Sequence, residues 1–245
     1  MFALDDPGLF GRLWAAGYDD GPNPDPAPAV DFLAALADGG PVLELAIGTG
    51  RVALPLAARG LQVEGVEASE EMVARLRAKP GGERLPVVVG DMADVPVSGP
   101  FTMVFLVYNT LFNLVDARRQ EDCFRNVARV LAPGGAFVIE TYVPDPDDID
   151  RTESQVQVRS VTEDSATIRV HRFDREAQTF VRQTITFDGQ GVHLKPFGMR
   201  YAWPEQIDEM AERAALRLTE RYADWHRRPF DAGSTSHVSV YRRSS

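Results

Sequence analysis

A carboxylate and two glycines fall within one short stretch, residues 42–51, at a spacing that suits nucleotide binding. Residues 42–47 are apolar except for Glu44, as in a strand that is buried on both faces. An ionised carboxylate there is costly unless a positive group lies opposite, so we expect Glu44 to face a ligand. Gly48 and Gly50 allow positive φ and a close approach of the backbone to that ligand. A helix predicted immediately after them would point its N-terminus at the same place.

Two interpretations of this turn follow from the residues. The sequence G-T-G-R-V-A at residues 48–53 matches the dinucleotide pattern G-x-G-x-x-A, and Glu67 places an acidic residue on the next predicted strand. This combination favours an NAD-binding domain. Glu44, however, would repel a pyrophosphate above the turn and attract an ammonium group. S-adenosylmethionine carries such an ammonium group.

Three further features follow successive predicted strands. Glu67 ends the second strand, where a carboxylate could accept both hydroxyls of a ribose. Asp91 and Met92 end the third strand and offer a carboxylate for an exocyclic amine and a thioether for a flat base, with Met72 on the other side. After the fourth strand, residues 108–113 form a polar and aromatic cluster. Taken singly, Glu67 is equally an acid at a helix start, Asp91 a turn residue, and the cluster a capped loop.

The elements that must position these residues alternate between strand and helix. We predict strands over residues 42–47, 63–66, 85–89, 101–107 and 136–143. We predict helices over residues 30–37, 51–59, 69–78 and 116–131, the third with Ser69 as its N-cap. Repeated βα units with short apolar strands form a parallel, doubly wound α/β sheet, whose ligand sites lie at the carboxyl ends of the strands.

The chain changes character on both sides of this core. An amphipathic helix with Phe10, Trp14 and Tyr18 is predicted before a Pro-rich connector. After residue 144, alternating apolar and polar residues predict antiparallel strands, followed by one more helix and two strands. These six predicted elements are the strands 156–161, 167–173 and 179–187, the helix 204–214 and the strand pair 216–222 and 236–241. The resulting division is an N-terminal lid helix and connector (1–28), a cofactor-binding core (29–143), an antiparallel β insertion over the acceptor (144–200) and a C-terminal part that completes the core sheet (201–245).

Composition narrows the function classes. A chain of 245 residues with 44% hydrophobic content suits one compact α/β unit, and without a long apolar run or a signal peptide we expect it to be cytoplasmic. Residues 1–150 carry 11 Lys and Arg against 23 Asp and Glu, which argues against nucleic acid as a partner. Cys123 is the single cysteine and is predicted to fill the core. The His and carboxylate spacings predict no metal site.

Joint occurrence of these motifs in order is more specific than any one of them. The sequence E-x-A-x-G-x-G at residues 44–50, Glu67, G-D-M at residues 90–92 and P-G-G at residues 133–135 together resemble the class I S-adenosylmethionine-dependent methyltransferase family. The resemblance covers residues 40–143 and implies a Rossmann-like seven-stranded sheet of order 3-2-1-4-5-7-6. The two C-terminal strands resemble the final antiparallel pair of that family.

The resemblance also implies how S-adenosylmethionine would bind. Glu44 would orient the methionine ammonium, Glu67 would hold the ribose, and Asp91 with the backbone of Met92 would bind adenine. The carbonyl of Leu106 or Val107 would receive the ammonium. The full set implied for the cofactor is Glu44, Ala46, Gly48, Thr49, Gly50, Arg51, Glu67, Ala68, Met72, Asp91, Met92, Leu106 and Val107.

The lid helix and the β insertion are similar to those of small-molecule methyltransferases that act on amino sugars and other secondary metabolites. In those enzymes a histidine proposed as the base follows the fourth strand, and here Asn113 takes its place. Asparagine cannot act as a general base near neutral pH, so the acceptor is nucleophilic unaided or another group supplies the base. The groups weighed for that role are Tyr18, His193, His226 and His237.

Three hypotheses therefore stand. The first is a methyltransferase that modifies an N or O atom of a small metabolite and acts as a monomer or homodimer, without nucleic acid or membrane partners. The second is an NAD-dependent oxidoreductase. The third is a protein that binds S-adenosylmethionine without methyl transfer, as a cyclase or a regulatory binder, and the presence of Asn113 keeps this option open.

Overall fold

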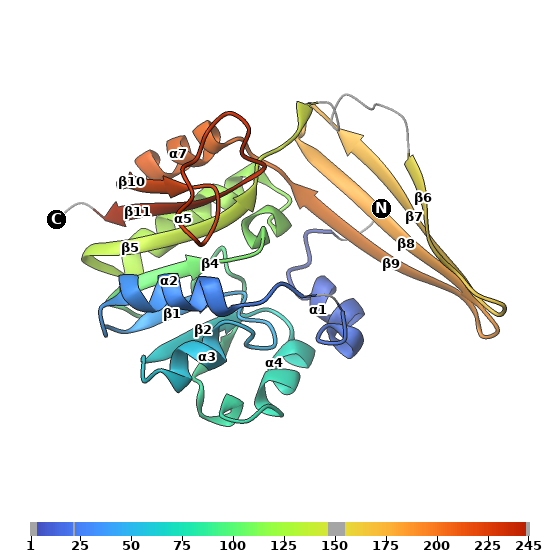
Figure 1. Cartoon of the computed structure of the whole chain (residues 1–245), viewed down its shortest axis with the longest axis horizontal. Helices are drawn as coiled ribbons and strands as arrows, with labels where there is room; N and C mark the ends of the chain where they lie inside the picture. Colours follow the sequence, from blue (N-terminus) through green and yellow to red (C-terminus); the bar gives the residue numbers. More distant parts are fainter. Residues whose placement is uncertain (1–3, 22, 147–154, 244–245) are drawn as a thin grey trace.

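The computed structural model describes residues 4–21, 23–146 and 155–243. Its strands form two sheets, one of seven strands with the order β10-β11-β5-β4-β1-β2-β3 and one of four with the order β6-β7-β8-β9 (Figure 1). Pro22 of the predicted connector and the start of the insertion at residues 147–154 lie outside the described residues.

The seven-stranded sheet has the predicted order. Its parallel strands are β1 (Val42–Leu45), β2 (Val63–Glu67), β3 (Val87–Val89), β4 (Phe101–Leu106) and β5 (Leu131–Tyr142). β10 (Leu216–Tyr222) and β11 (Ser236–Arg243) close it, and β11 runs antiparallel to both β5 and β10. The order from β3 to β10 corresponds to 3-2-1-4-5-7-6, which confirms the predicted α/β class.

Helices cover both faces of this sheet. The helical elements are α1 (Leu9–Trp14), η1 (Ala15–Gly17), α2 (Ala27–Ala37), α3 (Ala53–Ala58), α4 (Glu70–Arg77), η2 (Gly82–Arg84), η3 (Thr110–Asn113), α5 (Ala117–Val130) and α7 (Pro204–Arg213). Alternate residues of β1 enter two apolar layers: Leu43 packs with Phe124 of α5, and Val42 packs with Leu33 of α2. Ser69 caps α4 as predicted, its hydroxyl accepting from the Met72 N–H at 3.2 Å.

The β insertion is a sheet of its own that projects from the core (Figure 1). It consists of β6 (Gln155–Val161), β7 (Ala166–Asp174), β8 (Thr179–Asp188) and β9 (Gly191–Arg200), joined as an antiparallel meander. β9 was not predicted, because Pro196 and Gly198 disfavour a strand. It lies at the edge of the sheet, where a missing N–H is tolerated.

The N-terminal segment packs against the core next to this sheet. α1 contacts α4 so closely that a Cβ on Gly11 would meet the Ser69 side chain at 2.1 Å, and Gly198 of β9 faces Leu4. No helix among the described residues has the length and apolar character needed to cross a membrane.

Candidate functional site

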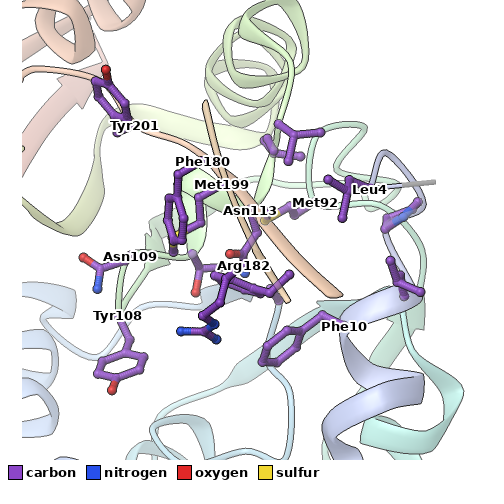
Figure 2. Close-up of a pocket in the computed structure, with 18 of the residues that line it drawn as sticks. Leu4, Phe10, Met92, Tyr108, Asn109, Asn113, Phe180, Arg182, Met199 and Tyr201 are labelled. Atoms are coloured by element: carbon purple, nitrogen blue, oxygen red, sulfur yellow. The ribbon is translucent and has the colours of Figure 1, made fainter. Parts of the chain in front are cut away.

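A cavity of about 900 Å³ lies where three parts of the chain meet: the carboxyl ends of the core strands, the N-terminal segment and one face of the four-stranded sheet (Figure 2). This is the edge of the sheet at which parallel α/β folds bind ligands. The predicted site residues that line it are Tyr18, Ala46, Gly48, Glu67, Ala68, Met72, Asp91, Met92 and Asn113.

The turn after β1 has the backbone that the glycines were expected to provide. Gly48 and Gly50 have φ of 55° and 80°, and Ala46 also has a positive φ of 51°. A Cβ on Gly50 would meet Leu54 and Leu76 at 3.1 Å, whereas at Gly48 nothing but a carbonyl lies within 4 Å. Gly50 is therefore required by packing, and Gly48 by its conformation and its place on the cavity wall.

Glu44 lies beneath this turn and is buried, but it is not among the residues that line the cavity. Burial raises its pKa to about 8, although the charge of Arg51 and the backbone N–H of Ala53 both oppose the increase. Its Oε2 is buried and has no hydrogen-bond partner. An orphaned carboxylate oxygen below a glycine turn fits the ammonium group that the sequence predicted above it.

Glu67 at the end of β2 and Asp91 just after β3 line the cavity wall. Glu67 accepts the N–H of Gly48 at 2.8 Å and that of Ser69 at 3.0 Å, while burial raises its pKa. Asp91 accepts from the Arg119 guanidinium at 2.8 Å. Arg119 also lines the cavity and was missed by the sequence analysis, because α5 approaches β3 only in the folded chain.

The loop after β4 is held in an unusual conformation over the cavity. Tyr108 and Asn109 both have positive φ, at 58° and 64°. Their N–H groups donate to the side chain and the carbonyl of Glu140 at 2.7 and 3.0 Å, and Asn109 Oδ1 accepts the Tyr142 N–H at 2.6 Å. Asn113 at the end of this loop faces the cavity, and its Oδ1 is buried with no partner.

Several predicted residues lie close to the cavity without lining it. Thr49 is buried and donates its hydroxyl to Asp19 at 2.7 Å, and Arg51 stacks on Tyr108 at 5.5 Å. Leu106 and Val107 are buried in the wall of the core. The Val107 carbonyl already accepts the Thr110 hydroxyl at 2.7 Å, which leaves it poorly suited to receive a cofactor ammonium.

Two of the histidines weighed as bases are placed elsewhere. His193 lies beside the β8–β9 turn, far along the projecting sheet, where it pairs with Asp188 at 3.1 Å and does not line the cavity. His237 is buried in β11 with both ring nitrogens hydrogen bonded, and burial lowers its pKa to about 3. Neither histidine is placed to act as a base at the cavity, because strand pairing carries both side chains away from it.

The other two groups differ from each other. His226 is exposed next to Trp225 in a surface pocket beside α2, and it does not line the cavity. Tyr18 does line it and packs edge-on against Phe10 at 6.0 Å. Burial raises the Tyr18 pKa, so the phenol stays protonated at neutral pH and can donate a hydrogen bond but not accept a proton.

The four-stranded sheet contributes polar groups that the sequence analysis did not select. His171 lines the cavity with a buried, unpartnered Nε2, and burial together with Arg182 lowers its pKa. Arg182 lines the same wall beside Phe180 (Figure 2). Alternation placed these side chains on one face of the strands, but only the packing of the sheet on the core shows which face meets the cavity.

Comparison with known proteins agrees with this geometry. Residues 42–135 match the family model described as a methyltransferase domain. The CcbJ methyltransferase from Streptomyces caelestis is 38% identical, with 100% of both chains covered and a TM-score of 0.86. The cypemycin N-terminal methyltransferase of a Streptomyces species is 29% identical over 218 residues, 84% of either chain. CalS10 from Micromonospora echinaspora, an amino pentose methyltransferase, is 20% identical over 95% of this chain and 97% of its own, with a TM-score of 0.68, which shows a shared fold.

The sheet order and the cavity at its carboxyl edge thus define a Rossmann-like methyltransferase. The chain belongs to the S-adenosylmethionine-dependent methyltransferases, and S-adenosylmethionine is its methyl donor. This family membership excludes the hypotheses of an NAD-dependent oxidoreductase and of a binding protein without methyl transfer.

Proposed function

We propose that this enzyme methylates an amine nitrogen of a small-molecule metabolite. The observation that carries the proposal is the amide oxygen of Asn113, which is buried at the cavity and lacks a partner. Such an oxygen accepts an N–H but cannot remove a proton at neutral pH, so it suits an acceptor that is nucleophilic as a neutral amine. Relatives named for N-terminal and amino-pentose methylation support the same acceptor class.

The donor side of the cavity is assigned to the residues after β1, β2 and β3. Glu44 would neutralise the methionine ammonium, Gly48 would let that end of the donor approach the backbone, and Glu67 would accept from the ribose. For adenine, Asp91 would accept from the exocyclic amine and Met92 would cover the ring. The orphaned Glu44 oxygen and the open Cβ position at Gly48 support this orientation.

The acceptor side requires alignment more than acid–base chemistry. When bound, S-adenosylmethionine supplies an electrophilic methyl group, and the C–S electron pair stays on sulfur as the new C–N bond forms. Asn113 would hold the amine N–H and so direct the nitrogen lone pair. The methylated nitrogen would keep its proton as an ammonium group and lose it to water after release. Burial and Arg182 lower the His171 pKa, so His171 would stay neutral and its free Nε2 could accept a hydrogen bond from the acceptor. Tyr18 and Phe10 would exclude water.

The test is transfer of labelled methyl from the donor to matched pairs of acceptors. Amino sugars and amino acids are offered beside the corresponding hydroxy compounds, and S-adenosylhomocysteine and labelled product are measured by mass spectrometry. We expect label in amines only. Label in the hydroxy compounds alone would show oxygen methylation and contradict the proposal.

A further inference from the structure

One face of the four-stranded sheet presents positive charge to the cavity. His171 on β7 pairs with Arg182 on β8, and Arg182 pairs with Phe197 on β9. Directly paired residues of antiparallel strands project from the same face, and all three line the cavity. Arg169 lies two residues before His171 and therefore shares that face.

Within the described residues, neither Arg169 nor Arg182 has a carboxylate partner. The Nε atoms of both are buried without a hydrogen bond. Burial, together with the charges of Arg169 and Arg159, lowers the pKa of Arg182 to about 10, and no acidic group contributes in the other direction. Partly buried guanidinium groups without a counter-ion are costly, which a structural role in a surface sheet does not require.

The Arg182 guanidinium is held in place by rings. Its Cζ lies 4.5 Å from the centre of Phe197 and 6.0 Å from that of Trp14. Figure 2 shows it projecting into the cavity between Tyr108, Asn113 and Phe10. Among the described residues, no hydrogen bond involves the two Nη atoms of this guanidinium, and a guanidinium matches a pair of oxygens on one anionic group.

We propose that the acceptor carries an anionic group, a carboxylate or a phosphate, which Arg182 binds through two parallel hydrogen bonds while Arg169 adds positive charge. The inference rests on the proposed function and narrows its substrate class. The amine nitrogen is held at Asn113, and the anionic group at the four-stranded sheet. Neutral amines that lack such a group are poor acceptors.

The experiment measures anion binding and donor binding separately. Sodium phosphate and sodium acetate are titrated calorimetrically into the protein saturated with S-adenosylhomocysteine, at constant ionic strength. The variants are Arg182→Gln, Arg182→Lys and Arg169→Gln. Arg172→Gln is the matched control, because Arg172 is exposed on the opposite face of β7 and its loss changes the charge equally.

We expect wild type and Arg172→Gln to bind at least one of the two anions, and the stronger of them identifies the acceptor group as phosphate or carboxylate. Loss of a charge-assisted hydrogen-bonding pair predicts about tenfold weaker binding in Arg182→Gln. Arg182→Lys keeps the positive charge but not the two parallel N–H donors of the guanidinium, so intermediate binding is expected. Thermal unfolding of this variant checks that its fold is intact.

The two proposals fail differently. If S-adenosylhomocysteine does not bind wild type, the proposed function is wrong. If S-adenosylhomocysteine binds all variants equally but neither anion binds the wild type, the proposed anion site is wrong. The same conclusion follows if both anions bind Arg182→Gln as tightly as the wild type. Neither result contradicts methyl transfer. A second measurement compares glucosamine 6-phosphate with glucosamine, and glycine with glycinamide, as acceptors. Equal rates within both pairs contradict the inference.

Discussion

At the scale of single residues, three buried polar atoms without a hydrogen-bond partner carry the proposed donor and acceptor sites. Glu44 Oε2 lies beneath the turn of the proposed donor side, whereas Asn113 and His171 line the cavity on the proposed acceptor side. Such atoms cost free energy in the unliganded protein and regain it when a ligand supplies the missing hydrogen bond or charge. The protonation state of Glu44 therefore predicts how donor binding depends on pH, and the amide oxygen of Asn113 predicts how acceptor binding depends on substitution.

The raised pKa of Glu44 predicts that donor binding is coupled to the release of a proton. In the free protein Glu44 is largely protonated below its pKa of about 8, and a nearby ammonium favours the ionised form. Binding therefore releases a proton, and affinity for S-adenosylmethionine should rise between pH 5.5 and pH 7. Calorimetry at pH 7 in two buffers of different ionisation enthalpy counts the protons. Glu44→Gln should bind about tenfold more weakly with a flat pH profile; an unchanged profile in this variant would place the titrating group elsewhere.

Substitution of Asn113 should affect the acceptor and spare the donor. Asn113→Leu removes the amide oxygen at similar volume, and loss of one hydrogen bond predicts a roughly 3- to 10-fold higher acceptor KM. Steady-state kinetics with an amine identified in the labelling experiment measure this change. Affinity for S-adenosylhomocysteine serves as the control, because a weaker value would mean that Asn113 supports the donor site.

At the scale of elements, polar contacts hold the C-terminal helix α7 against the last two strands of the core sheet. Arg221 of β10 donates to both oxygens of Asp208 on α7, at 2.6 and 3.1 Å, and the Tyr241 hydroxyl of β11 donates to the same carboxylate at 2.7 Å. The Arg221 side chain is 13% exposed. The Asp208 carboxylate therefore links α7 to β10 and β11 by hydrogen bonds.

Removal of this carboxylate should destabilise the protein strongly. Asp208→Ala leaves the Arg221 charge buried and unpaired, which predicts a loss of about 3–5 kcal/mol in the free energy of unfolding. Urea denaturation followed by circular dichroism measures it. Glu212→Ala is the comparison on the same helix, at an exposed position, and should change the value by less than about 0.5 kcal/mol. Equal effects of the two substitutions would refute the role of Asp208.

At the scale of the whole molecule, the N-terminal segment lines the cavity beside the glycine turn, on the proposed donor side. Asp19 accepts from Thr49 beside the glycine turn at 2.7 Å and from Lys79 after α4 at 2.9 Å. Lys79 also donates to the Thr49 carbonyl at 2.9 Å. Three segments that are distant in the sequence thus meet at one carboxylate, and α1 packs on α4 beside it (Figure 1).

Release of this contact should speed the escape of the donor. Asp19→Ala predicts a 3- to 10-fold higher dissociation rate of S-adenosylhomocysteine, because the segment opens more often while the donor contacts remain. Stopped-flow fluorescence measures the rate. Asp20→Ala removes a neighbouring exposed carboxylate and should leave the rate unchanged. If Asp19→Ala also leaves it unchanged, the segment does not gate the donor site.

Local pattern was enough to predict the core. Buried apolar strands alternating with helices predicted a parallel, doubly wound sheet, and Ser69 marked the start of α4, because these features depend on neighbours in the chain. The order of the strands was predicted from the family resemblance, and the structure has that order. The turn with Gly48 and Gly50 was predicted for the same reason, since its positive φ values are a local property.

The cavity wall formed by the four-stranded sheet could not be predicted in this way. The alternation of β7 and β8 showed that His171 and Arg182 share a face, but not whether that face meets solvent or the cavity. The position of β9 at a sheet edge, which tolerates Pro196, was likewise set by long-range pairing.

The sequence by itself therefore determined the alternating strands and helices and the position of a buried acid beneath a glycine turn, since each follows from contacts between near neighbours. The order of its motifs determined the strand order and the donor class through the family resemblance. Tertiary structure alone decided which side chains of the four-stranded sheet line the cavity. It removed His193 and His237 from the cavity and brought His171 and Arg182 into it. The physical reason is that this wall forms when separate segments, each with two possible faces, dock against the carboxyl ends of the core strands.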